Sequence, residues 1–332
     1  MTKKFEKSYV VVTDFIDLNL CNDVSEGLQK IIDENPNRTI YFPDGKYYIS
    51  KPLITPADPK LSVSLKLSAY AQIIATANWN GDGALVRLGG KNFANDIRTC
   101  GSNYFFDGGI LDGSGVADGI SIDGGRETVI RNVSIKHTRI GLCIKNGANS
   151  GSSDADIFGV NIVGNGKKDS IGILIEGCDN TLANMRIADV YTGVRIKSAG
   201  NMLRNIHPLY TLDFNEFENS CGFLCENHDN WFDFCYSDQF AIGFSLNNSA
   251  VLQNCFCYWY SPREKQHIGI KATRFDCIVN NFTIGFNGAE ARNAVVQVAE
   301  KGGKGILQNL IINDKALLKD NTHEEYLHGV VI

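Results

Sequence analysis

The sequence contains little proline and no cysteine pair spaced for a zinc site. Only 7 of its 332 residues are proline, and none of its 10 cysteines belongs to a C-x-x-C motif. We therefore expect no structural zinc site. Several cysteines fall at positions that should point inward, namely Cys225, Cys235, Cys255 and Cys257. These are expected to be free thiols that pack as small hydrophobic side chains in a reducing compartment.

Long apolar runs and an excess of positive charge are also missing. The first apolar run, Tyr9 to Val12, is too short for the core of a signal peptide, and no run approaches the length of a membrane span. The net charge is -5, whereas a nucleic-acid partner requires a basic face. We therefore expect no membrane partner and no nucleic-acid partner. A cytoplasmic location is expected unless a leader has been removed.

Glycine is abundant, with 33 residues, and several glycines open a recurring pattern. Each is followed by alternating apolar residues, and successive glycines are 21 to 31 residues apart. The repeats are GISI (119–122), GLCI (141–144), GILI (172–175), GVRI (193–196), GFLC (222–225), GFSL (243–246) and GIKA (269–272). A period of this length, filled by strand-like alternation, is typical of a solenoid.

A second element, with asparagine in a fixed slot, follows most of these glycines. It reads VIRNVSI (129–135), TLANMRI (181–187), MLRNIHP (202–208), VLQNCFC (251–257), IVNNFTI (278–284) and ILQNLII (306–312). Asparagine tolerates the left-handed backbone conformation that a sharp corner requires. In the repeat that starts at Gly222, the slot holds Phe234 instead.

Together these patterns predict an all-β fold, a right-handed parallel β-helix. The stretch 22–33 reads as an amphipathic helix that caps the first coil, with Val24, Leu28, Ile31 and Ile32 on its apolar face. We expect residues 1–50 to form this N-terminal cap and 51–332 the β-helix with a C-terminal cap, all in one structural domain. The tail at 317–332 is expected to be a terminal strand or cap.

The N-terminal stretch also carries a resemblance. The residues DF (14–15), the predicted helix and YFPDGKYYIS (41–50) resemble the opening of pectate-lyase-like, polygalacturonase-related proteins. In that family these elements, ending in a hairpin, cap a β-helix. The family's Gly-Asp-Gly segment after DF is replaced here by Ile16-Asp17-Leu18. The resemblance implies the fold and a carbohydrate substrate, while one scaffold of this kind supports several reactions.

The repeat is interrupted at one corner of the predicted coil. Between the asparagine slot and the next glycine, the loops at 207–220 and 258–267 carry extra residues, and 164–170 carries a smaller excess. Because the loops leave from one corner, they should wall a groove along one face, where solenoids usually bind ligands.

These loops and the coil between them supply the predicted site residues. Aromatic rings next to carboxylates suit a sugar, because rings pack on its C–H faces while two acids carry out proton transfer and nucleophilic or base chemistry. The predicted catalytic acids are Asp213, Glu216, Glu226 and Asp238. The predicted substrate-binding residues are His207, Tyr210, Trp231, Tyr236, Trp259, Tyr260, Arg263, Asp189 and Arg186. The leading hypothesis is an enzyme that cleaves or transfers a glycosidic bond in an oligo- or polysaccharide, without a cofactor.

Two alternatives to this hypothesis stay open, and one resemblance is set aside. The R-I-K triplet at 195–197 resembles that of polygalacturonases, but the sequence has no Asp-Asp pair and no Gly-His-Gly motif, so no polygalacturonase residues are transferred. A calcium-dependent lyase acting on a uronate polymer would use Arg186, Arg195, Lys197 or Arg263 as base. A tailspike-like β-helix would bind glycans without catalysis. The long flat faces are also compatible with a homotrimer.

One charged column has a simpler interpretation. The fourth residue after each glycine reads Asp123, Lys145, Glu176, Lys197, Glu226 and Asn247 along the chain. Stacked coils would bring these alternating charges together as surface ion pairs.

Overall fold

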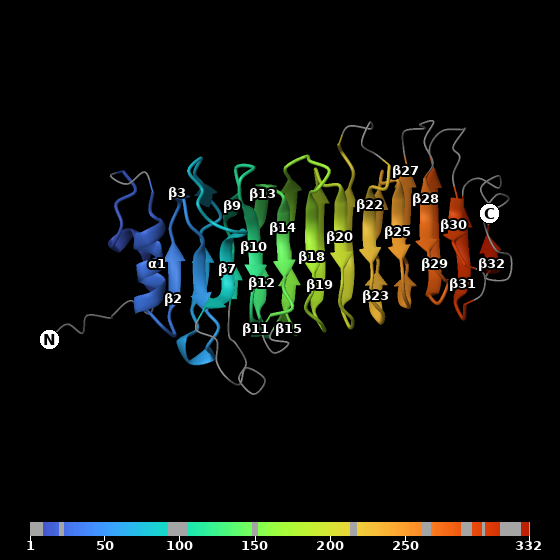
Figure 1. Ribbon diagram of the computed structural model, residues 1–332, viewed down its shortest axis with the longest axis horizontal. Coiled ribbons are helices and arrows are strands. Elements are labelled where there is room, and N and C mark those ends of the chain that lie inside the picture. Colours follow the sequence, from blue (N-terminus) through green and yellow to red (C-terminus); the bar gives the residue numbers. More distant parts are fainter. Residues whose placement is uncertain are drawn as a thin grey trace. The chain divides into compact units, whose positions relative to one another are not determined.

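Figure 1 shows the computed structural model, in which parallel strands follow one another along the chain. The described residues are 9–19, 23–91, 105–147, 152–212, 218–259, 267–286, 294–300, 303–312 and 327–331. They belong to two compact units, one of residues 1–138 and 142–160 and one of residues 139–141 and 161–332. Within the described ranges, no helix is long and apolar enough to cross a membrane.

The first unit opens with the helix predicted from the sequence. Helix α1 (Ser25–Glu34) buries Leu28, Ile31 and Ile32, the apolar side of its amphipathic pattern. The Gln29 amide fastens α1 to strand β4, because it accepts from the Ile54 N–H at 2.8 Å and donates to the Ile54 carbonyl at 2.9 Å. The capping helix is therefore confirmed.

The strands of the first unit form coils with parallel pairing. Three columns of strands are hydrogen-bonded in the orders β1–β2–β5–β8–β12–β16, β3–β6–β9–β13 and β4–β7–β10–β14. The elements are β1 (Val10–Val11), η1 (Val12–Asp14), β2 (Thr39–Phe42), β3 (Gly45–Ile49), β4 (Leu53–Pro56), η2 (Pro59–Leu61), β5 (Ser64–Leu67), β6 (Ala71–Ala75), β7 (Ala84–Lys91), β8 (Phe105–Asp107), β9 (Ile110–Asp112), β10 (Asp118–Ile122), β11 (Gly125–Arg126), β12 (Val129–Arg131), β13 (Ser134–Thr138), β14 (Ile140–Ile144), β15 (Ser152–Ser153) and β16 (Asp156–Phe158).

The predicted hairpin at 39–50 is wrong in its pairing. Strands β2 and β3 exist, but β2 pairs in parallel with β5 and β3 pairs in parallel with β6. The turn between them is a corner of the first coil, because Phe42 and Tyr47 point into the core and stack edge to face at 5.3 Å. The segment that resembles the family's cap thus already belongs to the β-helix.

The second unit continues the same plan over more coils. One column of strands runs β18–β20–β22–β25–β28–β30, side by side in Figure 1. The rest of each coil supplies the columns β19–β21–β23–β26–β29–β31–β32 and β17–β19–β21–β24–β27–β29–β31. The strands are β17 (Asn161–Gly164), β18 (Ile171–Ile175), β19 (Thr181–Ala188), β20 (Thr192–Ile196), β21 (Met202–Leu209), β22 (Cys221–Cys225), β23 (Asn230–Asp233), β24 (Tyr236–Asp238), β25 (Ile242–Leu246), β26 (Ala250–Gln253), β27 (Phe256–Trp259), β28 (Ile268–Ala272), β29 (Ile278–Phe286), β30 (Ala294–Val298), β31 (Ile306–Ile312) and β32 (Leu327–Val331).

Inward residues of successive coils stack into apolar columns. Val194, Phe223, Phe244 and Ile270 lie opposite one another in register, and each is fully buried. Phe223 and Phe244 stack face to face at 4.6 Å. The predicted repeat and the parallel β-helix are therefore confirmed. Strand β32 pairs in parallel with β31, as expected for a terminal strand at the C-terminal end.

The predicted corner slot has the predicted backbone conformation. The φ angles at Asn132, Asn184, Asn205, Phe234, Asn254, Asn281 and Asn309 lie between 50° and 57°. Amides in this slot also bond between coils, since Asn205 donates to Asn184 at 2.7 Å and Asn281 to Asn254 at 2.9 Å. Phe234 interrupts this ladder, because its ring offers neither donor nor acceptor.

A second asparagine ladder lies inside the second unit and was not predicted. Asn180 donates to the Asn201 side chain at 2.9 Å, and Asn201 donates to the Asn230 side chain at 3.1 Å. The same two acceptor oxygens also receive the backbone N–H groups of Asn180 and Asn201. All three side chains are buried, so the ladder satisfies backbone and amide groups where water does not reach.

Two pairs of the predicted ion-pair column form, one in each unit. Asp123 contacts Lys145 at 2.9 Å and Arg87, and Glu176 contacts Lys197 at 2.9 Å. Burial alone would raise the pKa of Asp123. Hydrogen bonds from Ser121, Lys145 and Arg87 outweigh this effect and hold the pKa below its usual value.

The cysteines behave as the sequence predicts. All eight described cysteines are free thiols, and all but Cys178 are buried. Burial raises the pKa of the Cys221 thiol to about 12 and that of Cys277 to about 12. A thiolate is therefore disfavoured at neutral pH, and the thiols should be chemically inert in the native protein.

We predict that iodoacetamide at pH 8 modifies Cys178 in the native protein and leaves Cys221, Cys257 and Cys277 unmodified. Buried neutral thiols are poor nucleophiles, whereas the Cys178 side chain is partly exposed. Peptide mapping by mass spectrometry measures each site, and the urea-unfolded protein serves as the control for full modification. Equal rates for these cysteines in the native protein would contradict the burial described here.

The replacement Phe234→Asn is predicted to stabilise the protein by about 1 kcal/mol. It removes a bulky residue from a backbone with φ of 53°, and its amide can bond the Asn205 and Asn254 side chains of neighbouring coils. Urea denaturation measures the change in the free energy of unfolding. Phe234→Ala is the control, because it keeps the unfavourable conformation without restoring the ladder. An asparagine variant no more stable than the alanine variant would refute the explanation.

Loss of the inner ladder of Asn180, Asn201 and Asn230 should lower the free energy of unfolding more than loss of a bond in the outer corner ladder. Asn201→Ala removes the acceptor of a buried backbone N–H and of a buried amide, so we expect a loss of about 3 kcal/mol. The matched control is Asn205→Gly, which deletes an amide of the outer ladder and keeps a residue that tolerates positive φ. Similar losses for the two variants in the same denaturation experiment would argue against the inner ladder as a stabilising element.

Candidate functional site

A polar cluster lies on the outer face of two neighbouring coils of the second unit. It consists of His207 on β21 and Tyr236 and Asp238 on β24. The pairing of Leu209 with Asp238 sets the register that places His207 opposite Tyr236. Their rings stack with centroids 4.1 Å apart and planes 13° from parallel. The structure therefore brings together three of the residues predicted from the sequence.

Asp238 is the central group of this cluster. It is 8% exposed, and its Oδ2 accepts from the Tyr236 hydroxyl at 3.1 Å and lies 3.6 Å from His207 Nε2. Neither Asp238 Oδ1 nor His207 Nε2 has a hydrogen-bond partner in the described part of the chain. A buried polar atom left unpaired costs about 1–3 kcal/mol, so this arrangement requires an explanation.

Gln239, the residue that follows Asp238 in the chain, carries two more unpaired atoms. It takes a φ of 64° and is 2% exposed. Neither its amide nitrogen nor its amide oxygen has a hydrogen-bond partner among the described residues. Buried amides elsewhere in this unit are fully bonded, as in the inner asparagine ladder. No motif in the sequence distinguishes Gln239, so it is not among the predicted site residues.

Tyr236 serves as a hydrogen-bond donor. Burial, followed by the charge of Asp238, raises the pKa of Tyr236 well above its ordinary value. The phenol therefore stays protonated at neutral pH and donates to the carboxylate. The ring is covered by His207 on one side and by Phe256 at 4.8 Å. Its faces are thus not available to a sugar ring, and only its edge is, which corrects the stacking role expected for this residue.

Two further predicted residues lie on the preceding coil. Arg186 is exposed on β19 and lies opposite His207 in register. The Thr211 hydroxyl donates to the Asp189 carboxylate and accepts from the Asp189 N–H at 3.0 Å. Gly166 lies close to Leu212, because a Cβ atom built on this glycine would be 3.7 Å from a Leu212 methyl group. The short excess at 164–170 therefore lies beside the start of the first long loop, as the common corner predicts.

Tyr210 and Trp259 are buried in the core, which contradicts their predicted role in binding a sugar. Tyr210 is 2% exposed and packs edge to face on Phe240 at 5.5 Å. Trp259 is 1% exposed and its indole N–H donates to the Phe240 carbonyl at 2.8 Å. The reason is that β21 and β27 extend into the stretches predicted to be loops at 207–220 and 258–267.

Glu226 also has a different role from the predicted one. Arg195 donates to both of its carboxylate oxygens at 2.9 Å, and this hydrogen bonding raises the pKa of Arg195. Gly222 lies against Ser237 of β24, because a Cβ atom built on this glycine would contact the Ser237 side chain. The Gly222 end of β22 is therefore the end nearest β24. Glu226 lies four residues further on, about 13 Å along the strand direction. That position is too far for a catalytic pair with Asp238, since such pairs are within about 9.5 Å.

The other predicted residues are separate from the cluster or outside the described ranges. Trp231 lies on β23, which precedes the corner at Phe234, whereas Asp238 lies on β24, which follows it. Asp213, Glu216, Tyr260 and Arg263 fall in segments outside the described residues, so their roles stay predictions. Among the described residues, no group of three or more His, Cys, Asp or Glu side chains could hold a metal ion.

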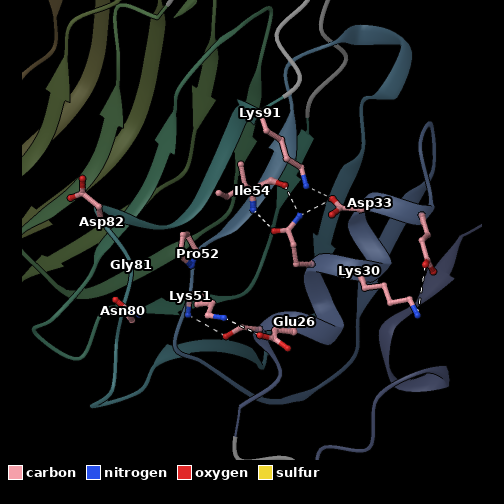
Figure 2. A pocket seen from close by; sticks show the side chains of 13 residues that line it. Glu26, Lys30, Asp33, Lys51, Pro52, Ile54, Asn80, Gly81, Asp82 and Lys91 are labelled. Carbon is pink, nitrogen blue, oxygen red and sulfur yellow. Dashed lines mark hydrogen bonds and ion pairs between the residues drawn. The ribbon is translucent and has the colours of Figure 1, made fainter.

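The first unit contains a cavity of about 700 Å³ beside α1. Figure 2 shows that its lysines point toward carboxylates: Lys51 contacts Glu26 at 2.9 Å, and Lys91 contacts Asp33. Lys30 is likewise within 3.8 Å of Glu34. All three lysines of the lining are thus paired with carboxylates of the same lining.

Comparisons with known proteins define the fold. The sequence matches no protein-family profile and no curated protein. Solved structures with similar folds include PfbA, a surface adhesin of Streptococcus pneumoniae, with a TM-score of 0.63 and 12% identity over 92% of this chain and 84% of that one. A tailspike protein of E. coli bacteriophage HK620 matches with a TM-score of 0.65 and 11% identity over 92% of this chain and 63% of that one.

An endo-xylogalacturonan hydrolase from Aspergillus tubingensis matches with a TM-score of 0.57 and 12% identity over 93% of this chain and 95% of that one. At such identities the likeness establishes the architecture alone. The chain has the right-handed parallel β-helix fold that these proteins share.

Proposed function

We propose that this chain is a carbohydrate-active β-helix protein that binds a glycan at the cluster of His207, Asp238 and Gln239. The observation that carries the proposal is the buried Asp238 carboxylate, which has one oxygen without a partner in the described part of the chain. A sugar hydroxyl would donate to this oxygen and satisfy it. Binding sites typically combine a few such polar groups that fix the orientation of the ligand.

The unpaired hydrogen-bond donors and acceptors of Asp238 and Gln239 fit a neutral sugar better than a charged one. Asp238 Oδ1 and Gln239 Oε1 accept hydrogen bonds, while Gln239 Nε2 donates them. Hydroxyl groups can match both kinds of atom. A uronate carboxylate has only acceptors and would be repelled by Asp238. In addition, Arg195 and Lys197, two of the bases considered for a lyase, are engaged in ion pairs with Glu226 and Glu176.

The proposed reaction is cleavage or transfer of a glycosidic bond, with Asp238 as one of two carboxyl groups. The second would come from Asp213 or Glu216, the acids predicted in the loop that follows β21. A separation of about 5–5.5 Å between the two would lead to retention of configuration, and about 6.5–9.5 Å to inversion. The hydrolase named among the similar folds supports this reaction class.

A second candidate is glycan binding without catalysis. It requires only the unpaired hydrogen-bonding atoms of Asp238 and Gln239 and no second carboxyl group. The adhesin and the tailspike among the similar folds are consistent with this alternative.

Asp238→Asn tests the proposal and separates the two candidates. We expect the variant to release reducing ends from the best substrate of an oligosaccharide panel at least 100-fold more slowly, because general acid–base groups contribute about 10²–10⁴-fold. Binding measured by calorimetry should change far less, since the amide keeps an acceptor oxygen. Absorbance near 235 nm would report a lyase product instead.

Asp233→Asn is the matched control. Asp233 lies in the same coil, and its carboxylate is 3.4 Å from Arg204 on the other side of the Phe234 corner. This variant should retain both activity and binding. If Asp238→Asn kept full activity and full affinity, the cluster would not be the site. Glycan binding by a wild-type protein that shows no turnover of any oligosaccharide in the panel would favour the non-catalytic candidate.

A further inference from the structure

The second unit carries an exposed apolar strip on the outer face that precedes the Phe234 corner. Five residues in register on successive coils form it: Met202, Trp231, Val251, Ile278 and Ile306. Four of them are 40% to 50% exposed, and Val251 is half-buried. Single exposed apolar residues are common on protein surfaces, but a continuous row marks a surface that contacts another molecule.

The corresponding column of the first unit is only partly apolar. Thr39, Ser64, Phe105, Val129 and Asp156 occupy it in the same kind of register. Polar residues are therefore compatible with this position in the coil. The five consecutive apolar residues of the second unit are not required by the fold.

A column of polar residues borders the strip, two positions further along each strand. Arg204 and Asp233 lie 3.4 Å apart, and the Asn280 amide donates to Gln253 at 3.4 Å. Their charges cancel in pairs, and amides offer a donor and an acceptor to an identical amide. The strip and its border thus carry no net charge, whereas the whole chain carries -5. Two copies would therefore meet on this face without net electrostatic repulsion.

The spacing of the strip indicates its occupant. Side chains recur once per coil, about 4.8 Å apart, over five coils. A second stack of coils presents side chains with the same spacing and can interdigitate along the whole length. Interfaces that hold chains together bury about 800 Å² per partner, so the polar border must be included with the five apolar residues.

We propose that this chain associates with a second copy of itself, side by side, through the strip centred on Val251. The apolar side chains form the dry centre of the contact, and the bordering amides and ion pairs form its rim. This surface is separate from the cluster around Asp238, and the proposal does not depend on the proposed function.

Sedimentation equilibrium of the full chain with Ile278→Asp tests the proposal. The wild-type protein should sediment as a dimer of chains of 36.5 kDa, and Ile278→Asp should shift it to the monomer. The matched control is Ile311→Asp, which alters an isoleucine of similar exposure, 48% against 50%, outside the strip. This control should sediment as the wild type does. A monomeric wild type, or equal dissociation in both variants, would overturn the proposal.

A cross-linking variant covers the case in which the aspartate variant fails to fold. Val251 is the middle residue of the strip, so it faces its own copy whether the two chains run parallel or antiparallel. With oxidised glutathione as oxidant, two Val251→Cys thiols would form one intermolecular disulfide and release two molecules of reduced glutathione. Ile311→Cys is the control. A covalent dimer of the first variant alone supports the strip, and its absence, or equal dimer in both variants, contradicts it.

Discussion

The in-register stacking of coils through parallel hydrogen bonds is the constraint on which the rest of this structure depends. It places like positions of successive coils above one another, so each choice of residue is repeated as a column. Inward columns become the apolar core, as at Val194, Phe223 and Phe244. Outward columns become ion pairs, amide ladders or apolar rows. The sharp corner of the asparagine slot forms where a residue takes a positive φ.

The same constraint explains why the cluster around Asp238 stands out. A column of buried polar groups can satisfy itself from coil to coil, as Asn180, Asn201 and Asn230 do. Asp238 and Gln239 are buried to a similar degree but leave polar atoms unpaired within the described residues. Natural proteins tolerate such unpaired groups mainly where function requires them. The cluster also lies at the corner where the repeat is interrupted by insertions, which is where solenoids usually bind ligands.

Much of the fold could be predicted because its determinants are local and repeated. The glycine pattern, the asparagine corner and the amphipathic helix each follow from short stretches of sequence. The site was only partly predictable. His207, Tyr236 and Asp238 were selected by residue type and corner position, whereas the burial of Tyr210 and Trp259 depends on how far β21 and β27 extend. The inner asparagine ladder and the unpaired amide of Gln239 depend on contacts between coils, which a single sequence does not reveal.

The central claim is that the Asp238 carboxylate binds a sugar hydroxyl on this face of the coil. A crystal structure of the protein soaked with the oligosaccharide that binds best in solution tests this claim most directly. The account predicts a hydroxyl within about 3 Å of Asp238 Oδ1, with the Gln239 amide bonded to the same sugar. Sugar density over the Arg195–Glu226 ion pair, with Asp238 Oδ1 still unpaired, would contradict it.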